Sequence, residues 1–123
     1  MITKVKPYSR YVLLGIETIK QHIDNHPLQH RTAAELFDRL SAPNRSIVEK
    51  AFKEIYGAGI KEYQVRQRLE ASKKFLEMGL TKKQVASKCF YKGQAAFCRA
   101  FKKEFSITPT DWQNGVSQYS NAL

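Results

Sequence analysis

Long hydrophobic runs are absent from this sequence of 123 residues. The longest apolar stretch near the N-terminus covers residues 11–14, Tyr-Val-Leu-Leu. A membrane-spanning helix needs about 20 apolar residues, and the hydrophobic part of a secretory signal needs roughly seven or more. No lipidation motif is present either. We therefore expect no membrane segment and a cytoplasmic protein.

Cysteine is scarce as well, and its spacing excludes the usual cysteine sites. The chain has two cysteines, Cys89 and Cys98, which are 98 − 89 = 9 positions apart. This spacing fits neither a CxxC pair nor another common arrangement of metal ligands. We expect reduced, buried thiols and no disulfide.

The sequence contains no recognisable combination of catalytic residues. The sequence offers no Ser/His/Asp or Cys/His arrangement, no phosphate-binding loop and no pair of carboxylates on an apolar helix face. The one candidate is His22, His26 and His30, because imidazoles four residues apart on a helix can share a metal ion. Pro27 lies between the last two and is expected to end the helix. We expect surface histidines, no metal, no cofactor and no enzyme activity.

Acidic residues are outnumbered by basic ones. The chain contains 21 Lys and Arg against 11 Asp and Glu, which gives a formal net charge of +10 and a sequence pI near 9.8. Residues 1–30 hold four of the cations and two of the anions, which leaves 21 − 4 = 17 and 11 − 2 = 9 for residues 31–123. Such an excess favours nucleic acid or an acidic membrane surface as a partner.

What the chain does contain is an internal repeat. Residues 51–63, AFKEIYGAGIKEY, resemble residues 100–112, AFKKEFSITPTDW, and Phe52 and Phe101 are 101 − 52 = 49 positions apart. The same offset relates Thr32 to Thr81, Leu36 to Val85, Val48 to Phe97, Lys50 to Arg99, Tyr56 to Phe105 and Tyr63 to Trp112. Two units are too few for a continuous stack of repeats. Each unit must therefore close a small core of its own.

The first half of the chain predicts three helices. From residue 8 to about residue 25, apolar side chains recur every three to four positions, at Val12, Ile16, Ile19 and Ile23. Residues 32–35, Thr-Ala-Ala-Glu, fit a capping box that opens a short helix to about Leu40. Residues 41–43, Ser-Ala-Pro, cannot continue that helix, and Asn44 can then cap a further helix to about Tyr56.

A long connecting helix is predicted over residues 60–78. This stretch contains no Pro or Gly, and Gly79 can form its C-cap. Its apolar or small face carries Ile60, Tyr63, Leu69, Ser72 and Leu76. One helix of this length would hold the two repeated units rigidly apart.

The second half repeats the pattern of the first. Residues 81–84, Thr-Lys-Lys-Gln, fit another capping box, which opens a short helix to about Cys89. After a break, a further helix is predicted over residues 93–105. Residues 108–111, Thr-Pro-Thr-Asp, are typical of a helix start and open a last helix that ends near Tyr119. No stretch alternates apolar and polar residues over the length of a strand, so the predicted class is all-α with about seven helices.

Each half thus contains a short helix, a tight break and a second helix that carries basic and polar residues. This pattern is typical of the helix-turn-helix motif, which lays its second helix in the major groove of DNA. The sequence therefore predicts two helix-turn-helix modules joined by a long connecting helix. The expected parts are an N-terminal arm over residues 1–9, a first module over 10–59, a connecting helix over 60–79 and a second module over 80–123.

The repeated residues also resemble a known family. The similar residues are Phe52-Lys53, Gly57, Tyr63, Arg68-Leu69, Val85-Ala86, Phe101-Lys102, Phe105, Pro109 and Trp112. Together they resemble the AraC/XylS DNA-binding domain, over roughly residues 10–115. The resemblance implies a bacterial transcriptional regulator that places two recognition helices in successive major grooves and binds an asymmetric site as a monomer. It also suggests contact with RNA polymerase. Many relatives carry a ligand-sensing domain, for which residues 1–30 are too few, so we expect a stand-alone regulator or else an excerpt.

Several positions depart from the family pattern. The turn of each module, where relatives commonly have Gly, is Ser-Ala-Pro over residues 41–43 and Phe-Tyr-Lys over residues 90–92. These turns suggest that the first module binds weakly and that the second supplies most of the specificity. Relatives favour a small residue where the two helices of a module cross, which Ala86 satisfies, but its counterpart is Phe37. Two registers, one residue apart, therefore stay open for the first module. In the last motif, Ser106 and Gln113 replace the usual Gly and Arg.

The aromatic stripe of each second helix determines which residues face DNA. When the stripes point inward, helical geometry turns other positions outward. The predicted base contacts are Arg45, Ser46, Glu49 and Lys50 in the first module and Gln94, Ala95 and Arg99 in the second. Arg suits guanine, Gln suits adenine, Glu can accept from a cytosine amino group, and Ala can contact a thymine methyl group. For Glu49, a solvated side chain or a pair with Lys53 is the alternative.

Other cations and the helix starts are better suited to phosphate groups. The predicted phosphate contacts are Thr32, Lys53, Thr81, Lys82, Lys83 and Lys102. The aromatic residues have helical spacing, so we expect them to fill the cores and not to stack on single-stranded bases. The predicted function is a sequence-specific regulator that binds double-stranded DNA. The alternative is a basic helical protein that binds nucleic acid without specificity or binds a protein partner.

Overall fold

The computed structural model describes residues 8–40 and 44–122, with side chains as far as residue 115. Seven α-helices and no strand occur in this part of the chain. They are α1 (Arg10–Asn25), α2 (Ala33–Leu40), α3 (Arg45–Tyr56), α4 (Ile60–Glu77), α5 (Lys82–Lys88), α6 (Gln94–Phe105) and α7 (Pro109–Ala122). The predicted all-α class is confirmed. None of these helices combines the length and the apolar character needed to cross a bilayer.

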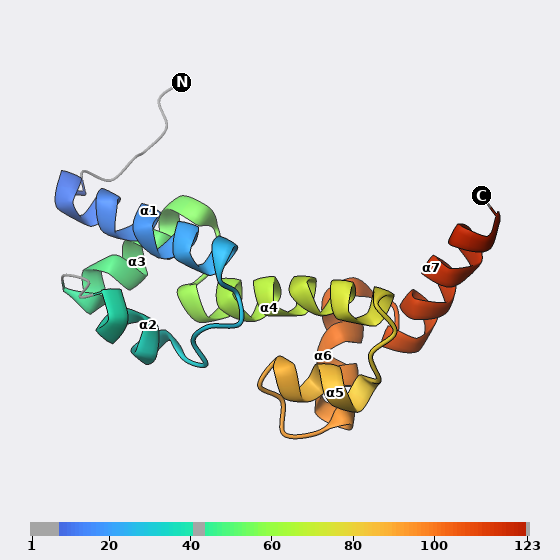
Figure 1. Cartoon of the computed structure of the whole chain (residues 1–123). Coiled ribbons are helices and arrows are strands. Elements are labelled where there is room, and N and C mark those ends of the chain that lie inside the picture. Colours follow the sequence, from blue (N-terminus) through green and yellow to red (C-terminus); the bar gives the residue numbers. More distant parts are fainter. Residues whose placement is uncertain (1–7, 41–43, 123) are drawn as a thin grey trace.

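Two groups of helices lie at the two ends of α4 (Figure 1). α1, α2 and α3 surround its N-terminal end, and α5, α6 and α7 surround its C-terminal end. Each group encloses a separate hydrophobic core. α4 belongs to both, because Ile60 is buried in the first core whereas Leu69 and Leu76 are buried in the second. The predicted pair of small cores is therefore present.

Reciprocal side-chain caps fix the starts of α2 and α5, as the sequence predicted. At α2, the backbone N–H of Thr32 donates to Glu35 Oε2 at 3.1 Å, and the N–H of Glu35 donates to Thr32 Oγ1 at 3.2 Å. At α5, the N–H of Thr81 donates to Gln84 Oε1 at 2.9 Å, and the N–H of Gln84 donates to Thr81 Oγ1 at 3.1 Å. Both capping boxes are confirmed, and they set the same starting point for the two modules.

The remaining boundaries follow the prediction with one difference. The side chain of Asn44 caps α3 by accepting a backbone N–H at 3.4 Å. The predicted break at residues 41–43 and residues 1–7 of the predicted arm lie outside the described residues. α7 continues to Ala122, beyond the predicted end near Tyr119. No Pro or Gly stands between these two positions to stop it.

The 49-residue offset holds without a slip over three consecutive helices. α2 and α5 begin at Ala33 and Lys82, α3 and α6 at Arg45 and Gln94, and α4 and α7 at Ile60 and Pro109, with 82 − 33 = 94 − 45 = 109 − 60 = 49. Only one of the two open registers is consistent with this result. Phe37 therefore occupies the position of Ala86, and both side chains are buried. The first module accepts a large residue where the second has a small one.

A second offset relates α1 to α4. The matching residues are Val12 and Val65, Ile16 and Leu69, Lys20 and Lys73, and Ile23 and Leu76, with 65 − 12 = 69 − 16 = 73 − 20 = 76 − 23 = 53. α1 thus has the same role in the first module as α4 has in the second. Each module consists of four helices, and α4 is the last helix of one module and the first helix of the other.

The equivalent lysines of α1 and α4 each lie over a pair of aromatic rings. The distances from Nζ to the ring centroids are 5.7 and 5.6 Å for Lys20 over Tyr56 and Tyr63, and 3.8 and 4.8 Å for Lys73 over Phe105 and Trp112. Such cation–π contacts stabilise exposed sites by about 0.5–1 kcal/mol each. The predicted aromatic residues therefore pack within the modules and are not arranged to stack on bases.

The interior face of α4 carries polar side chains that the apolar stripe did not predict. Gln64 is 3% exposed and Arg68 is 7% exposed. Gln64 Nε2 donates to the carbonyl of His30 at 3.1 Å, and Arg68 Nη2 donates to the carbonyl of Arg31 at 2.9 Å. At the 49-residue offset from Gln64, Gln113 Nε2 donates to a carbonyl at 2.7 Å in the second module. In both modules, a glutamine of the last helix thus donates to a backbone carbonyl. Gln64 contacts the segment that follows α1, and Gln113 contacts the end of α4.

Three histidines gather where α1 meets the segment before α2. The ring centroid of His22 lies 5.1 Å from that of His26 and 5.1 Å from that of His30. Among the described residues, no group of three or more His, Cys, Asp or Glu is placed to hold a metal ion. His22 and His30 are partly buried and His26 is exposed, so the expectation of surface histidines was wrong for His22 and His30, whose rings pack against each other. Burial lowers the pKa of His22, and the neighbouring His30, His26 and Arg39 lower it further.

We predict that acid destabilises the first module through His22. Its folded pKa lies below its unfolded value of about 6.5, so below that pH the unfolded chain binds more protons. The stability is complete above about pH 6.5 and is lost as the pH falls through the folded pKa. Urea unfolding at pH 7.5 and pH 5.5 should show a smaller acid loss for His22→Gln than for the wild type. An equal loss in both proteins would contradict the prediction.

α3 and α6 are each followed by a residue that adopts the left-handed conformation. Gly57 follows α3 with φ of 83°, and Ser106 follows α6 with φ of 60° at the same position of the repeat. Gly79, the predicted C-cap of α4, is also left-handed with φ of 89°, although the helix ends at Glu77. Only glycine adopts this conformation without strain between Cβ and the backbone. Ser106 therefore carries strain that Gly57 avoids.

We predict opposite effects on stability for the two exchanges at these positions. Ser106→Gly should raise the free energy of unfolding, and Gly57→Ser should lower it, each by about 1 kcal/mol. A Cβ atom at Gly57 would meet no atom within 4 Å, so the effect of Gly57→Ser is confined to the backbone. Urea denaturation followed by circular dichroism measures both changes. A Ser106→Gly protein that is less stable than the wild type would refute the assignment of strain.

Candidate nucleic-acid interface

α3 and α6 are the second helices of the two modules, and each buries an aromatic stripe. Phe52 of α3 and Phe97 and Phe101 of α6 are completely buried. The predicted base contacts lie outside these stripes. Arg45, Ser46, Lys50, Gln94, Ala95 and Arg99 are exposed, and Glu49 is partly exposed. The geometry leaves all seven side chains accessible to a partner.

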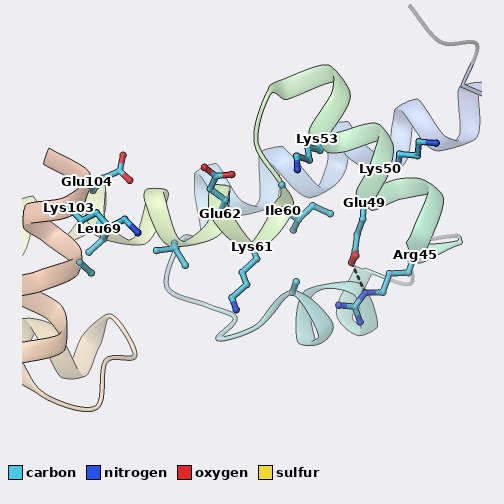
Figure 2. Close-up of a pocket in the computed structure, with 14 residues that line it drawn as sticks. Arg45, Glu49, Lys50, Lys53, Ile60, Lys61, Glu62, Leu69, Lys103 and Glu104 are labelled. Atoms are coloured by element: carbon cyan, nitrogen blue, oxygen red, sulfur yellow. Dashed lines mark hydrogen bonds and ion pairs between the residues drawn. The ribbon is translucent and has the colours of Figure 1, made fainter.

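Arg45 and Glu49 contact each other on the surface of α3 (Figure 2). Arg45 Nε donates to Glu49 Oε1 at 3.1 Å, across one helical turn. The guanidinium carbon of Arg45 also lies 5.0 Å from the centroid of the Phe37 ring of α2. Glu49 therefore pairs with Arg45, and the alternative partner Lys53 was wrong.

The two thiols of the chain have different environments. Both are free. Cys89 is buried in the second core, and this burial raises its pKa to about 11. Cys98 lies partly exposed on α6, so the prediction of buried thiols was wrong for it. It follows Phe97 by one residue and therefore lies at the edge of the buried stripe.

The predicted phosphate contacts fall into three groups. Lys53, Lys83 and Lys102 are exposed. The Thr32 and Thr81 hydroxyls already accept backbone N–H groups of their capping boxes. Lys82 Nζ donates to Thr110 Oγ1 of α7 at 2.7 Å. The three exposed lysines are thus free to extend toward a partner, whereas Lys82 bridges two helices of its own module.

A concavity of about 1020 Å³ lies between α3 and α6, with α4 along its base (Figure 2). Its charged lining consists of Arg45, Lys50, Lys53, Lys61 and Lys103 together with Glu49, Glu62 and Glu104. The carboxylates are all paired, because Glu49 contacts Arg45 and both Glu62 and Glu104 contact Arg66, at 3.6 and 3.3 Å. The four lysines make no hydrogen bond or ion pair with another residue in the described part of the chain. The concavity therefore presents uncompensated positive charge.

Lys61 and Lys103 are the members of this set that the sequence did not single out. Lys61 lies on α4, which was interpreted as a connector, and Lys103 follows the predicted contact Lys102 by one residue. Both are exposed. No sequence pattern brings α3, α4 and α6 to one concavity, since that requires the three-dimensional placement of two modules. The signal that was available was only the local excess of lysine.

Comparison with known proteins places this geometry in a family. The model of a helix-turn-helix domain family of AraC type matches residues 38–115, which are 115 − 38 + 1 = 78 of the 123 residues. The match includes the last three residues of α2, all of α3 to α6 and the first half of α7. A search of curated proteins gives no significant match.

Three solved structures share the fold. The xylose-binding transcription activator xylR superposes with a TM-score of 0.69 at 22% identity, over 90% of this chain and 28% of that one. A DNA-binding transcriptional dual regulator from Escherichia coli K-12 gives 0.71 at 19% identity, over 95% and 99% of the two chains. The C-terminal domain of AraT, a response regulator from Geobacillus stearothermophilus, gives 0.66 at 19% identity, over 89% and 88%.

The family match and the fold agree, although the chain spans less than a third of the length of xylR. The matched family is a regulatory fold that binds DNA, and the three structures share the fold of this chain. Two modules at a fixed offset, each with an exposed second helix, fit that family. The chain therefore belongs to the AraC-type helix-turn-helix family of DNA-binding domains.

Proposed function

We propose that the chain recognises a specific, asymmetric site on double-stranded DNA as a monomer, with α3 and α6 in two successive major-groove segments. The observation that supports this most directly is the concavity between the two helices, because lysines of both modules line it. A duplex lying across both helices would present its major groove to them about 10 base pairs apart. The footprint would then cover on the order of 20 base pairs.

Base readout falls to the residues near the starts of the two helices. Arg99 suits guanine, Gln94 suits adenine, and Ala95 suits the methyl group of thymine. At the same positions of the first module stand Lys50, Arg45 and Ser46. The equivalent positions therefore carry different chemistry, which supports an asymmetric site.

Phosphate contacts fall to the exposed lysines around this surface. Lys53 lies on α3, Lys102 lies on α6 and Lys83 lies on α5. We add Lys61 and Lys103, which would meet the backbone between the two major-groove segments. The contributions of Thr32 and Thr81 come through the N-termini of α2 and α5, because their hydroxyls serve as caps. Lys82 contributes less than its neighbour because it is bonded to Thr110.

Two further features belong to the proposal, the first from the family resemblance and the second from the helix pattern of the sequence. One is contact between the DNA-bound protein and RNA polymerase. The other is the division of the chain into an arm over residues 1–9, modules over 10–59 and 80–123, and a connecting helix over 60–79. The shared position of α4 supports its role as the rigid element between the modules.

Selection of bound duplexes from a random DNA pool tests the proposed function. The selected duplex and a scrambled duplex are then titrated over a range of salt concentrations. We expect an asymmetric motif with two blocks about one helical turn apart, bound roughly 10³-fold or more tightly than the scrambled duplex. If no motif is enriched and every duplex shows the same steep salt dependence, the chain is a non-specific polyanion binder.

We predict that Arg99→Ala weakens binding to the selected duplex by about 1–3 kcal/mol and removes the preference at one base pair. The reason is that a guanidinium donates two hydrogen bonds to guanine, which alanine cannot replace. Titration against duplexes with single base-pair changes measures both effects. Lys74→Ala is the matched control, because Lys74 is exposed on α4 and lines a different depression. An equal loss on every duplex would assign Arg99 to phosphate.

A further inference from the structure

The first residue of α3 is held from two sides before any partner binds. The guanidinium carbon of Arg45 lies over the Phe37 ring, 5.0 Å from the ring centroid. Its Nε donates to Glu49 Oε1 at 3.1 Å. A cation–π contact and a hydrogen bond together restrict the rotation of a long side chain.

The aromatic part of this arrangement is itself fixed. Phe37 is only 7% exposed and packs in the first hydrophobic core. Its ring is therefore a rigid support and not a mobile surface group. Glu49 stands one helical turn after Arg45 on the same helix, so its carboxylate is positioned by the helix. Both restraints on Arg45 thus come from regular, packed structure.

The donors that guanine requires remain available. A guanidinium has five N–H donors, and the contact with Glu49 uses the single N–H of Nε. The two terminal nitrogens keep four N–H groups, and the Arg45 side chain is 51% exposed. Two such donors are what the O6 and N7 atoms of guanine accept in the major groove. The contact with Glu49 therefore leaves base readout possible.

None of the three components recurs in the second module. At the 49-residue offset, Phe37 corresponds to Ala86, Arg45 to Gln94 and Glu49 to Cys98. The backbone geometry is shared, since the helices start at equivalent positions. The arrangement is therefore a property of these side chains and not of the fold.

We propose that Phe37 and Glu49 are positioning residues that hold the Arg45 guanidinium for recognition of a guanine by the first module. This inference rests on the proposed function. A side chain that is already ordered loses less conformational freedom on binding. The negative charge of Glu49 also repels a neighbouring phosphate from Arg45. This repulsion favours contact with a base over non-specific contact with the DNA backbone. The first module thus supplies a base preference of its own, contrary to the hypothesis that it binds weakly and leaves specificity to the second.

The test begins with the free protein, where the order of Arg45 is observed through its Nε–H signal by NMR. In the wild type we expect a resolved signal with slow hydrogen exchange. Glu49→Ala should return this signal to the behaviour of a free arginine, whereas Glu49→Gln retains an oxygen acceptor and should preserve part of the order. An Arg45 signal that is already mobile in the wild type would overturn the proposal without reference to DNA.

The second arm measures discrimination between duplexes that differ at single base pairs of the selected site. Arg45→Ala should abolish the preference at one base pair. Glu49→Ala should reduce that same preference roughly two- to tenfold, the range expected for one hydrogen bond, and Glu49→Gln should restore part of it. In the Arg45→Ala background, Glu49→Ala should have no further effect at that base pair.

Controls separate positioning from general effects of charge and stability. Glu62→Ala removes another carboxylate from the same concavity, one that pairs with Arg66, and should leave the base preference unchanged. Phe37→Leu should act like Glu49→Ala on preference, and its unfolding is measured separately because Phe37 is buried. Equal changes on every duplex for Glu49→Ala would overturn the positioning role while the proposed function stands. The absence of any selected motif would refute the proposed function and this inference with it.

Discussion

The sharing of α4 between two cores is the constraint on which the rest of the structure depends. Ile60 near its start is buried in the first module, and Leu69 and Leu76 are buried in the second. A single helix therefore belongs to both modules, and its rise of about 1.5 Å per residue sets the distance between them. A flexible linker would leave that distance variable, and fixing the distance on binding would then cost conformational entropy. Here α3 and α6 keep one spacing before DNA is present.

Buried polar side chains of α4 also fix the segment between α1 and α2. Seven residues separate α1 from α2, from His26 to Thr32, whereas four separate α4 from α5. The longer segment exposes more backbone carbonyls near the core, and unpaired carbonyls are costly when buried. Gln64 and Arg68 of α4 donate to two of them, at His30 and Arg31. The same helix that fixes the spacing of the modules thus also fixes the segment that leads into α2.

Local rules predicted the fold well because side-chain caps mark the starts of α2, α3 and α5. The two capping boxes at Thr32 and Thr81 mark the starts of two helices, and the 49-residue offset pairs six of the helices before any packing is considered. The interior role of Arg68 was missed, since periodicity assigns burial to apolar residues only. Lys61 was missed for a different reason, because its surroundings depend on which helices meet in space and no spacing along one helix contains that information. The pair of Arg45 and Glu49 has i,i+4 spacing within α3, so the sequence did contain its signal.

The equal register of the two modules has a consequence for specificity. In the proposed complex, equivalent backbone positions meet the groove in the same way, so any difference between the two selected DNA segments must come from side chains. The positions of Arg45, Glu49 and Lys50 carry Gln94, Cys98 and Arg99 in the second module. A duplication of the fold has therefore not duplicated the pattern of hydrogen-bond donors and acceptors. Reversing the protein on an asymmetric site would place each set of side chains against the wrong bases, and one orientation is favoured by chemistry alone.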